Sequence, residues 1–443
     1  MTSTNAYEQN VNVRNILKFA IPTIIMTIFM SFYTMVDGLF VSNLLGTDAL
    51  SAINLTAPII ALVTAVSTML ASDGSALIMK KVGEGKGEEA KQDFTFLILV
   101  NVVVGAIMTV VAYLLMDKIF LSMDLSSTTF NYCHDYLSHY LFFVIAILLM
   151  NNFTLYMIAV GKSNLSILCS IGGGITNIIL DYFLIAKCHM GIKGAAIATG
   201  IGYSITAIVG LYIFSKKTEM IHFTKLKCRL ATLLKAITNG SSEMATALVT
   251  GITTMLFNAS MLYYVGEDGV AAITIIMYVL MFATSLYTGY AYGVAPMISY
   301  YHGQQNHEKL HKLINLSLKI IATVALVSLI SSIALTKPLV SIFTSVDNPV
   351  YQLAVNGNQL CSIAIIFIGF NIFVSSLFTA LSNGLISAVI AFSRSFVFMI
   401  IALITLPKLL GINGIWLATP VAELASFILA SIMFIIFKKR YRY

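Results

Sequence analysis

Two aspartates lie inside hydrophobic segments of this sequence that are long enough to cross a lipid bilayer. Asp37 lies within the apolar run 16–41, and Asp181 lies within the run 164–186. An aspartate at the centre of a membrane helix costs about 2.5 to 3.5 kcal/mol on insertion scales, so such a residue is expected to face the protein interior and to bind an ion or a proton. The two carboxylates therefore predict a cation or proton site.

Asn177 and Thr199 add further oxygen atoms to this predicted site. Asn177 precedes Asp181 by four residues, so the two side chains share one face of a helix, and Thr199 lies at the start of the next apolar run. If the first helix packs against this pair, the four side chains surround one pocket whose oxygen ligands suit a hard cation or a proton. Two carboxylates in a poorly solvated pocket titrate as a coupled pair. The alternative is that Asn177 and Asp181 only join helices through hydrogen bonds.

The composition indicates the class of protein that holds this site. Of 443 residues, 58% are hydrophobic and only 10% are charged, which excludes a soluble globular domain. Apolar runs of about 20 residues, each able to span the hydrocarbon core as a helix, recur along the chain. The first run is too long for a cleaved signal sequence. We predict an all-α polytopic membrane protein with twelve transmembrane helices, at 16–41, 53–79, 94–116, 136–160, 164–186, 192–214, 236–264, 271–298, 313–336, 352–379, 384–407 and 412–437.

The basic residues are distributed unevenly between the predicted loops. With the N-terminus in the cytoplasm, twenty lysines and arginines lie on the cytoplasmic side and five on the outer side. This asymmetry satisfies the positive-inside rule and predicts a multi-pass protein of the plasma membrane with both termini cytoplasmic. The anionic surface of the bilayer accounts for the net charge of +7, so no nucleic acid partner is expected.

The two halves of the chain repeat each other at a shift of 220 residues, and eleven residues in widely separated blocks recur in this one register. Each half holds six predicted spans, so the halves enter the membrane the same way round and are related by an axis along its normal. We predict an N-terminal lobe at 1–214 and a C-terminal lobe at 236–443, joined by a cytoplasmic linker at 215–235, in a V shape around a central cavity. The repeated residues include Gly46, Asp48, Gly83, Gly191 and Gly194, which recur as Gly266, Asp268, Gly303, Gly411 and Gly414.

Several of these motifs resemble those of the multidrug and toxic compound extrusion (MATE) family, in particular its DinF-like branch. Pro22 precedes Asp37 by fifteen residues, the segment 46–52 reads Gly-Thr-Asp-Ala-Leu-Ser-Ala, and the segment 177–199 is similar to the fifth and sixth helices of the family. The resemblance covers essentially the whole chain, and it implies two six-helix bundles that work by alternating access. It also implies that the cation or proton site of the N-terminal lobe is formed by Asp37, Asn177, Asp181 and Thr199.

Pro22 predicts a bend near the cytoplasmic end of the first helix, because proline removes a backbone hydrogen bond and crowds the preceding turn. The resemblance implies that this bend is a hinge that changes when Asp37 on the same helix is protonated. The alternative is a static bend, which is common for prolines in membrane helices.

Three charged residues, Glu243, Arg394 and Glu423, lie within or at the edges of apolar runs in the second half of the chain. Because an unpaired charge would be costly there, we predict a salt-bridge network among them, with a second cation or substrate site as the alternative. Asp73 lies in the second apolar run. It is expected either to add a negative wall to the substrate cavity or to cap a loosened turn.

The eighth predicted helix is rich in methionine and tyrosine, whose adaptable sulfur and aromatic faces suit flat, lipophilic cations. The acidic balance of the charges inside the membrane also favours cationic substrates. The alternative is ordinary packing, for which membrane helices also carry such residues. The candidates for the lining of the substrate cavity on this helix are Met277, Met281, Tyr287 and Tyr290.

Together these features predict a secondary active antiporter that exports small organic compounds, cationic and lipophilic, in exchange for inward movement of protons or sodium ions. It is expected to act as a monomer in the lipid bilayer, without enzymatic activity or a cofactor, and with no metal other than a sodium ion at the cation site. A flippase for a lipid-linked precursor is the alternative among transporters, but it would need several arginines around its cavity, and only Arg394 is available. An enzyme that acts on lipid within the membrane would need a cluster of histidine, serine or aspartate residues near one interface, and we find none in the sequence.

Overall fold

The computed structural model describes residues 10–45, 47–123 and 125–443, and every regular element within these ranges is a helix. Asp37 lies in the first helix, but its side chain lies outside the description. The predicted all-α fold is therefore confirmed, whereas the position of this carboxylate stays a prediction. The side chains outside the description are those of residues 34–43, 47, 48, 50, 51, 54, 242, 245–248, 250, 251 and 267.

The first half of the chain forms long helices because its apolar runs are interrupted only by short polar segments. Ser126 begins one of these helices as an N-cap, since its hydroxyl accepts a hydrogen bond from the backbone N–H of Thr129. The helices are α2 (Val13–Leu45), α3 (Thr47–Gly83), α4 (Gly87–Leu121), α5 (Ser127–Leu141), α6 (Val144–Ala159), α7 (Ser163–Asp181), the π-helix η1 (Tyr182–Lys187) and α8 (Ile192–Phe214).

The second half repeats this pattern with more breaks inside its later spans. Asn306 and Asn348 cap two of its helices with their side-chain oxygens, and Pro349 occupies the first helical turn after Asn348. The helices are α9 (Leu230–Tyr264), α10 (Glu267–Gly303), α11 (His307–Ala334), α12 (Thr336–Ser341), α13 (Pro349–Cys361), the 3₁₀ turn η2 (Ser362–Ala364), α14 (Ile365–Ala380), α15 (Gly384–Phe392), the π-helix η3 (Ser393–Phe398), α16 (Met399–Leu410) and α17 (Ile412–Tyr441).

Most of these elements are long and apolar enough to cross a membrane. Within the described part of the chain, ten helices meet this criterion, and α5 and α6, which are bent by 54° relative to each other, make an eleventh span as a pair. The remaining predicted span, 236–264, coincides with α9, a helix of 35 residues. The chain is thus a multi-pass membrane protein.

The backbone repeats at corresponding points of the two halves. Gly191 (φ 59°, ψ −142°) and Gly411 (φ 58°, ψ −135°) precede α8 and α17 in the same conformation, which glycine adopts readily because it has no Cβ. Gly85 and Gln305, which are also 220 residues apart, both have positive φ. The sequence repeat is therefore accompanied by a repeat in the turns of the chain.

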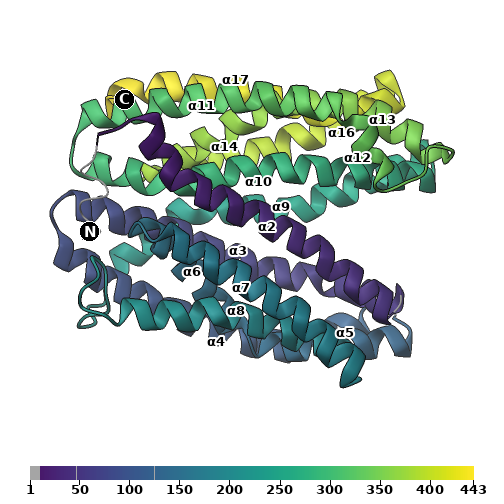
Figure 1. The fold of residues 1–443 in the computed structure, drawn as a ribbon, viewed down its shortest axis with the longest axis horizontal. Helices are drawn as coiled ribbons and strands as arrows, with labels where there is room; N and C mark the ends of the chain where they lie inside the picture. The colour runs from purple at the N-terminus through teal and green to yellow at the C-terminus, as the bar shows by residue number, and fades with distance from the viewer. Residues whose placement is uncertain (1–9, 46, 124) are drawn as a thin grey trace.

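Helices from the two halves meet along two long contacts. α2 packs along α10, and α3 packs along α9. Figure 1 shows α10, α11, α14 and α17 above, α4, α6, α7 and α8 below, and α2 running obliquely between them. α2 begins and α17 ends at the same end of the bundle, which we name the terminal end, and the opposite end is the far end (Figure 1).

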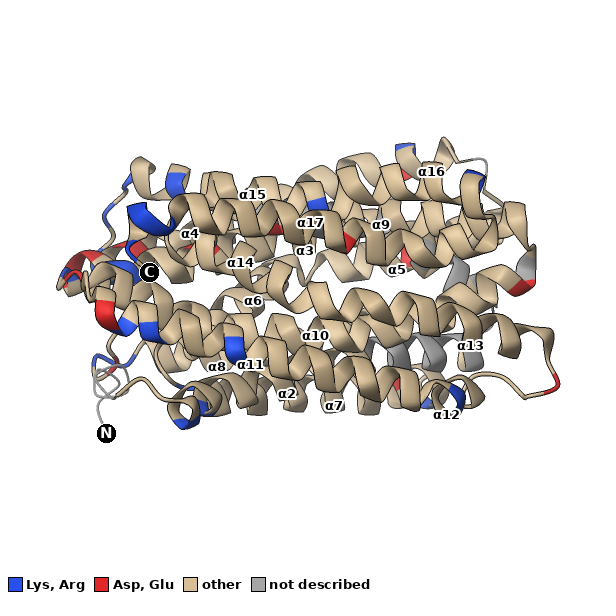
Figure 2. Ribbon diagram, turned by 90° about the horizontal axis from the view of Figure 1, so that it is seen from above, with Lys and Arg blue, Asp and Glu red and all other residues tan. Residues whose placement is uncertain are grey.

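Most of the lysines and arginines gather at the terminal end (Figure 2). Arg229 precedes α9 there, and its Nη1 lies 2.5 Å from Glu89 Oε2 on α4. Lys81 lies 3.4 Å from the same Glu89 oxygen and also pairs with the buried carboxylate of Asp93. The segment between α8 and α9 is thereby fastened to the helices of the first half.

Candidate cation site and substrate cavity

A buried polar cluster lies between α7 and α8. The Asn177 Nδ2 donates a hydrogen bond to the Thr199 Oγ1 at 3.1 Å, and Thr199 in turn donates to the Ala195 carbonyl oxygen at 3.0 Å. Asn177 is 1% exposed and Asp181, one turn further along α7, is 0% exposed. The structure thus brings together Asn177 and Thr199 as expected, with Asp181 on the adjacent turn.

Two glycines set the distance between these helices. A β-carbon added to Gly173 would lie 2.6 Å from the carbonyl oxygen of Gly202, and one added to Gly202 would lie 2.7 Å from the carbonyl oxygen of Gly173. α7 and α8 therefore touch backbone to backbone. This close approach allows the short Asn177 side chain to reach Thr199.

α2 covers the same part of α7. A β-carbon added to Gly174 would lie 2.8 Å from the Phe29 ring and 3.5 Å from the Tyr33 ring. Asp37 follows Tyr33 by one helical turn, and α2 and α7 both run from the terminal end toward the far end. The backbone of α2 therefore continues toward the level of Asp181, although the meeting of the two carboxylates stays a prediction.

The helix changes its geometry directly after Asp181. Residues 182–187 form the π-helix η1, and the backbone N–H of Cys188 bonds to the Phe183 carbonyl oxygen across this wider turn. Short π-helical segments often occur at functional sites, because they re-aim side chains within a continuous helix. This π-helix was not predicted from the sequence.

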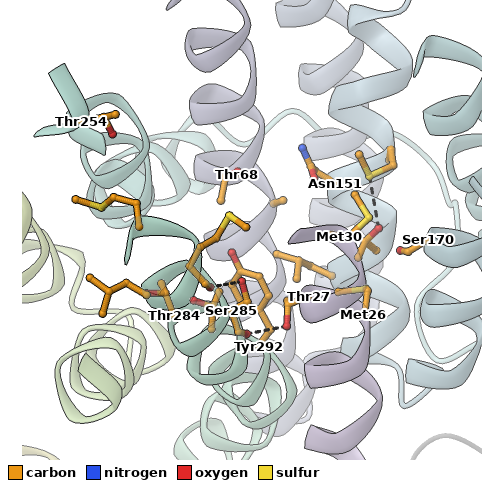
Figure 3. Close-up of a pocket in the computed structure, with 18 residues that line it drawn as sticks. Met26, Thr27, Met30, Thr68, Asn151, Ser170, Thr254, Thr284, Ser285 and Tyr292 are labelled. Carbon is orange, nitrogen blue, oxygen red and sulfur yellow. Dashed lines mark hydrogen bonds between the residues drawn. The ribbon is translucent and has the colours of Figure 1, made fainter. Parts of the chain in front are cut away.

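A central cavity of about 620 Å³ lies between the helices of the two halves. Figure 3 shows Met26, Thr27 and Met30 of α2 at this cavity together with Ser285 and Tyr292 of α10. Its described lining contains five methionines and eight serine or threonine residues, and no charged side chain is among these described residues. The cavity is large enough for a drug-sized molecule.

Only part of the predicted lining faces this cavity. Met277 and Met281 belong to it, as expected. Tyr287 and Tyr290, each 3% exposed, instead pack α10 against α14, where Tyr287 covers Gly369. Asp73 is not among the described lining residues, and α3 runs through it unbroken, so the loosened turn expected there does not form.

The molecule is closed at the terminal end and hollow toward the far end. A second hollow of about 1530 Å³ lies toward the far end, and Thr254 belongs to the lining of both hollows. At the terminal end, a β-carbon on Gly83 would collide with the Tyr300 carbonyl oxygen, and one on Gly303 would collide with the Lys80 carbonyl oxygen. These two contacts join α3 and α10.

The charged residues of the second half do not form the single network that we predicted. Arg394 Nε lies 2.8 Å from Glu423 Oε1, and Asn371 Nδ2 donates to Glu423 Oε2 at 2.7 Å. Glu243 belongs to a different polar group, because its Oε1 accepts from Thr379 at 3.3 Å. The prediction is therefore correct for the Arg394 and Glu423 pair and wrong for Glu243, which lies on another helix and faces the first half.

A row of hydroxyl side chains on α2 was not predicted from the sequence. Thr23 Oγ1 donates to the Gly289 carbonyl oxygen at 2.6 Å, Thr27 Oγ1 donates to the Ser285 carbonyl oxygen at 2.7 Å, and the hydroxyls of Ser31 and Ser285 lie 2.5 Å apart. The hydroxyl residues of α2 recur every four residues directly after Pro22, and this spacing could have predicted that they share one face of the helix. The row joins the two halves along α2 and α10.

Helices of membrane length around a central cavity, with a buried polar cluster beside it, define a polytopic membrane transporter. A model of the MatE family matches residues 22–183 and, a second time, residues 243–404. The chain therefore belongs to the MatE family, and it is a transporter and not an enzyme. The two matched segments also fall close to the 220-residue shift of the internal repeat.

Curated relatives and solved structures agree with this assignment. The chain is 25% identical over 441 residues to the multidrug export protein MepA of Staphylococcus haemolyticus, covering 98% of this chain and 96% of that protein. It is 22% identical over 422 residues to a MepA of Staphylococcus aureus, covering 94% and 92%. A multidrug resistance MATE family transporter of the MOP superfamily, solved in an outward-facing conformation, superposes with a TM-score of 0.90 at 20% identity and 96% coverage of both chains. A MATE protein solved in a bent conformation gives a TM-score of 0.89 at 20% identity, with 100% coverage of both chains.

Proposed function

We propose that the chain exports small organic compounds by alternating access, and that a proton or sodium ion bound by Asp37, Asn177, Asp181 and Thr199 drives the export. The observation that carries this proposal is the fully buried Asp181 next to the Asn177–Thr199 hydrogen bond, within the bilayer-spanning part of the molecule. A buried carboxyl in a membrane helix is stabilised by binding a cation or a proton. The MepA relatives, which are multidrug export proteins, support the direction of transport.

We infer that the terminal end faces the cytoplasm and that the membrane is the plasma membrane. The gathering of lysines and arginines at that end supports this orientation by the positive-inside rule. The hollow far end then faces outward, where a proton or sodium ion reaches the N-terminal site and a substrate leaves. In this scheme the segments 1–214 and 236–443 act as two lobes joined by the linker 215–235, and Pro22 serves as the hinge of α2.

The substrates are proposed to be lipophilic compounds with a preference for cations. Five methionines supply polarizable, adaptable surface to the central cavity, which suits substrates of varied shape. Charge preference then comes from the carboxylates of the coupling site rather than from the described cavity wall. A place in the DinF-like branch of the family rests on the motif that joins Pro22 and Asp37.

The test is export from proteoliposomes under separate sodium and proton gradients. Wild-type protein should move a lipophilic fluorescent cation against its gradient with one of the two ions, and Asp37→Asn and Asp181→Asn should each reduce the driven rate by about tenfold or more, the scale of a typical coupling free energy. Asp347→Asn, which changes an exposed aspartate in the loop before α13, is the matched control and should keep the wild-type rate.

Gradient-independent movement in the wild type and in both variants would overturn the antiport mechanism. Gradient-driven export that survives both Asp37→Asn and Asp181→Asn would place the coupling site elsewhere.

A further inference from the structure

Asp73 is a buried carboxyl that the proposed transport site does not use. It lies within α3, is 1% exposed, and neither of its carboxylate oxygens has a hydrogen-bond partner among the described residues. A carboxylate without hydrogen bonds in an apolar environment is strongly disfavoured relative to its neutral form. Its burial therefore favours a bound proton.

Asp73 faces α9, a helix of the other half. A β-carbon added to Gly240 would lie 2.7 Å from Asp73 Oδ2 and would collide with the Met69 carbonyl oxygen, so the two helices touch at this point. Glu243 follows Gly240 by one turn, and its Oε1 lies 3.5 Å from the hydroxyl of Ser72, the neighbour of Asp73. Two carboxyls from opposite halves therefore share one contact between α3 and α9.

The internal repeat places the same two positions opposite each other elsewhere. At the shift of 220 residues, Asp73 corresponds to Gly293 and Glu243 corresponds to Thr23. A β-carbon added to Gly293 would lie 2.6 Å from Thr23 Oγ1, and Thr23 bonds to the Gly289 carbonyl oxygen at 2.6 Å. Of the two related contacts between the halves, one is thus neutral and hydrogen-bonded, whereas the other carries two carboxyls.

Among the described residues, two phenols from other helices lie near this part of α3. Tyr292 of α10 lines a small cavity together with Ser72 of α3, and the Tyr156 hydroxyl of α6 lies 2.6 Å from a β-carbon added to Gly74. Lys80, on the same helix as Asp73, lies two turns nearer the terminal end. The described surroundings therefore supply hydroxyls, which can relay a proton between the carboxyls and water.

A small cavity lies beside this contact. It has a volume of about 20 Å³ and is lined in part by Ser72, Thr379 and Tyr292, of which Ser72 and Thr379 bond to Glu243. Tyr292 also lines the central cavity. The small cavity has room for roughly one water molecule beside the hydroxyls that bond to Glu243.

We propose that the pair of Asp73 and Glu243 carries one proton while α3 and α9 are in contact, and that this proton, by removing one of the two negative charges, holds the helices together as a second protonation site, separate from the cluster at Asp181. When the proton is lost to water, two negative charges face each other across the contact and the helices separate. The inference rests on the alternating-access function proposed above. It adds that a proton bound at this site keeps the terminal end closed.

The test measures the opening of the terminal end directly, without a gradient or a substrate. Spin labels are placed at Glu88 and Glu308, exposed positions related by the repeat, after the exposed Cys188 and Cys228 are replaced by serine. In the wild type, the population with the short label distance should fall by about tenfold as the pH is raised, the scale expected of a coupling between protonation and conformation. In the variant Asp73→Asn with Glu243→Gln, this population should stay constant.

Glu243→Thr is a second variant, and it installs the residue that the repeat itself uses at the corresponding position. It should fold, because Thr23 occupies the equivalent contact, and it should also lose the pH dependence. A wild-type distance that does not change with pH would overturn the inference whether or not the variants fold, and so would a pH dependence that persists in Glu243→Thr. If the wild type shows the predicted pH response but no gradient-driven export, the inference is supported and the proposed transport mechanism is overturned.

Discussion

Two carboxylates in the second half, Glu423, which is buried, and Glu243, which is partly buried, have different surroundings. Glu423, 4% exposed, is bonded by both Arg394 and Asn371. Glu243 is bonded by the hydroxyls of Ser72 and Thr379. A carboxylate paired with a guanidinium keeps its charge and fixes its helix, whereas one bonded by hydroxyls can take up or release a proton. The Arg394–Glu423 pair is therefore structural.

Replacing Arg394 with methionine leaves the Glu423 carboxylate buried without its counter-ion. Because removal of one partner of a buried ion pair is strongly destabilising, we expect the free energy of unfolding in detergent to fall by about 3 kcal/mol. Lys408→Met, at an exposed position near the end of α16, is the matched control and should change this free energy by less than about 0.5 kcal/mol. Equal effects of the two substitutions would show that the pair contributes nothing to stability.

At the residue scale, the spacing of residues along one helix predicted which side chains share a face of that helix. It did not predict which neighbouring helix that face contacts. The interval of four residues between Asn177 and Asp181 predicts that they share one side of α7, and the structure places Asn177 in a hydrogen bond with Thr199. Glu243 was assigned to the wrong partner and Tyr287 to the wrong surface. Spacing gives the relative direction of two side chains on a helix, but neighbouring helices decide how that helix is rotated about its axis.

The contact between α2 and α10 is held by side-chain hydroxyls rather than by apolar packing alone. Ser31 and Ser285 meet across this contact at 2.5 Å. Ser285 also lines the central cavity (Figure 3). Hydrogen bonds between membrane helices contribute about 0.6 kcal/mol on average. Such weak bonds can break and re-form, which suits a contact that would slide in the proposed alternating-access cycle.

A double-mutant cycle of Ser31→Ala and Ser285→Ala measures this bond. The coupling free energy for unfolding in detergent should be about 0.6 kcal/mol, because each hydroxyl keeps its bond to the backbone of its own helix when the other is removed. The pair Ser31→Ala and Thr238→Val is the control, since Thr238 is exposed and bonds only within α9, and its coupling should be near zero. Equal couplings in the two cycles would exclude a specific bond between α2 and α10.

At the element scale, hydropathy predicted where the chain crosses the membrane but not how each span is built. The predicted span 136–160 is the bent pair of α5 and α6, and the span 164–186 ends in the π-helix η1. Both features leave the local hydrophobicity unchanged, because they alter the hydrogen-bonding pattern within an apolar segment. They therefore lie beyond what an apolar run can predict.

At the scale of the whole molecule, the repeat is the most useful feature of the sequence. It relates Gly83 to Gly303, and the structure brings these two glycines to the crossing of α3 and α10 at the terminal end. Each glycine contacts a backbone carbonyl of the opposite helix, Tyr300 in one case and Lys80 in the other. The sequence could not show that these positions meet, because the repeat relates the two halves without giving the angle between them.

Leucine at Gly83 and Gly303 should prevent closure of this crossing. A side chain at either position would overlap backbone atoms that cannot move aside, so the closed state is destabilised while a state open at the terminal end is unaffected. We expect the short-distance population of labels at Glu88 and Glu308 to fall by more than about tenfold, together with the rate of export. Gly87→Leu is the matched control, because a β-carbon there meets nothing within 4 Å, and it should keep the wild-type distances. Unchanged distances in Gly83→Leu with Gly303→Leu would mean that the two halves of the molecule are not held closed at this crossing.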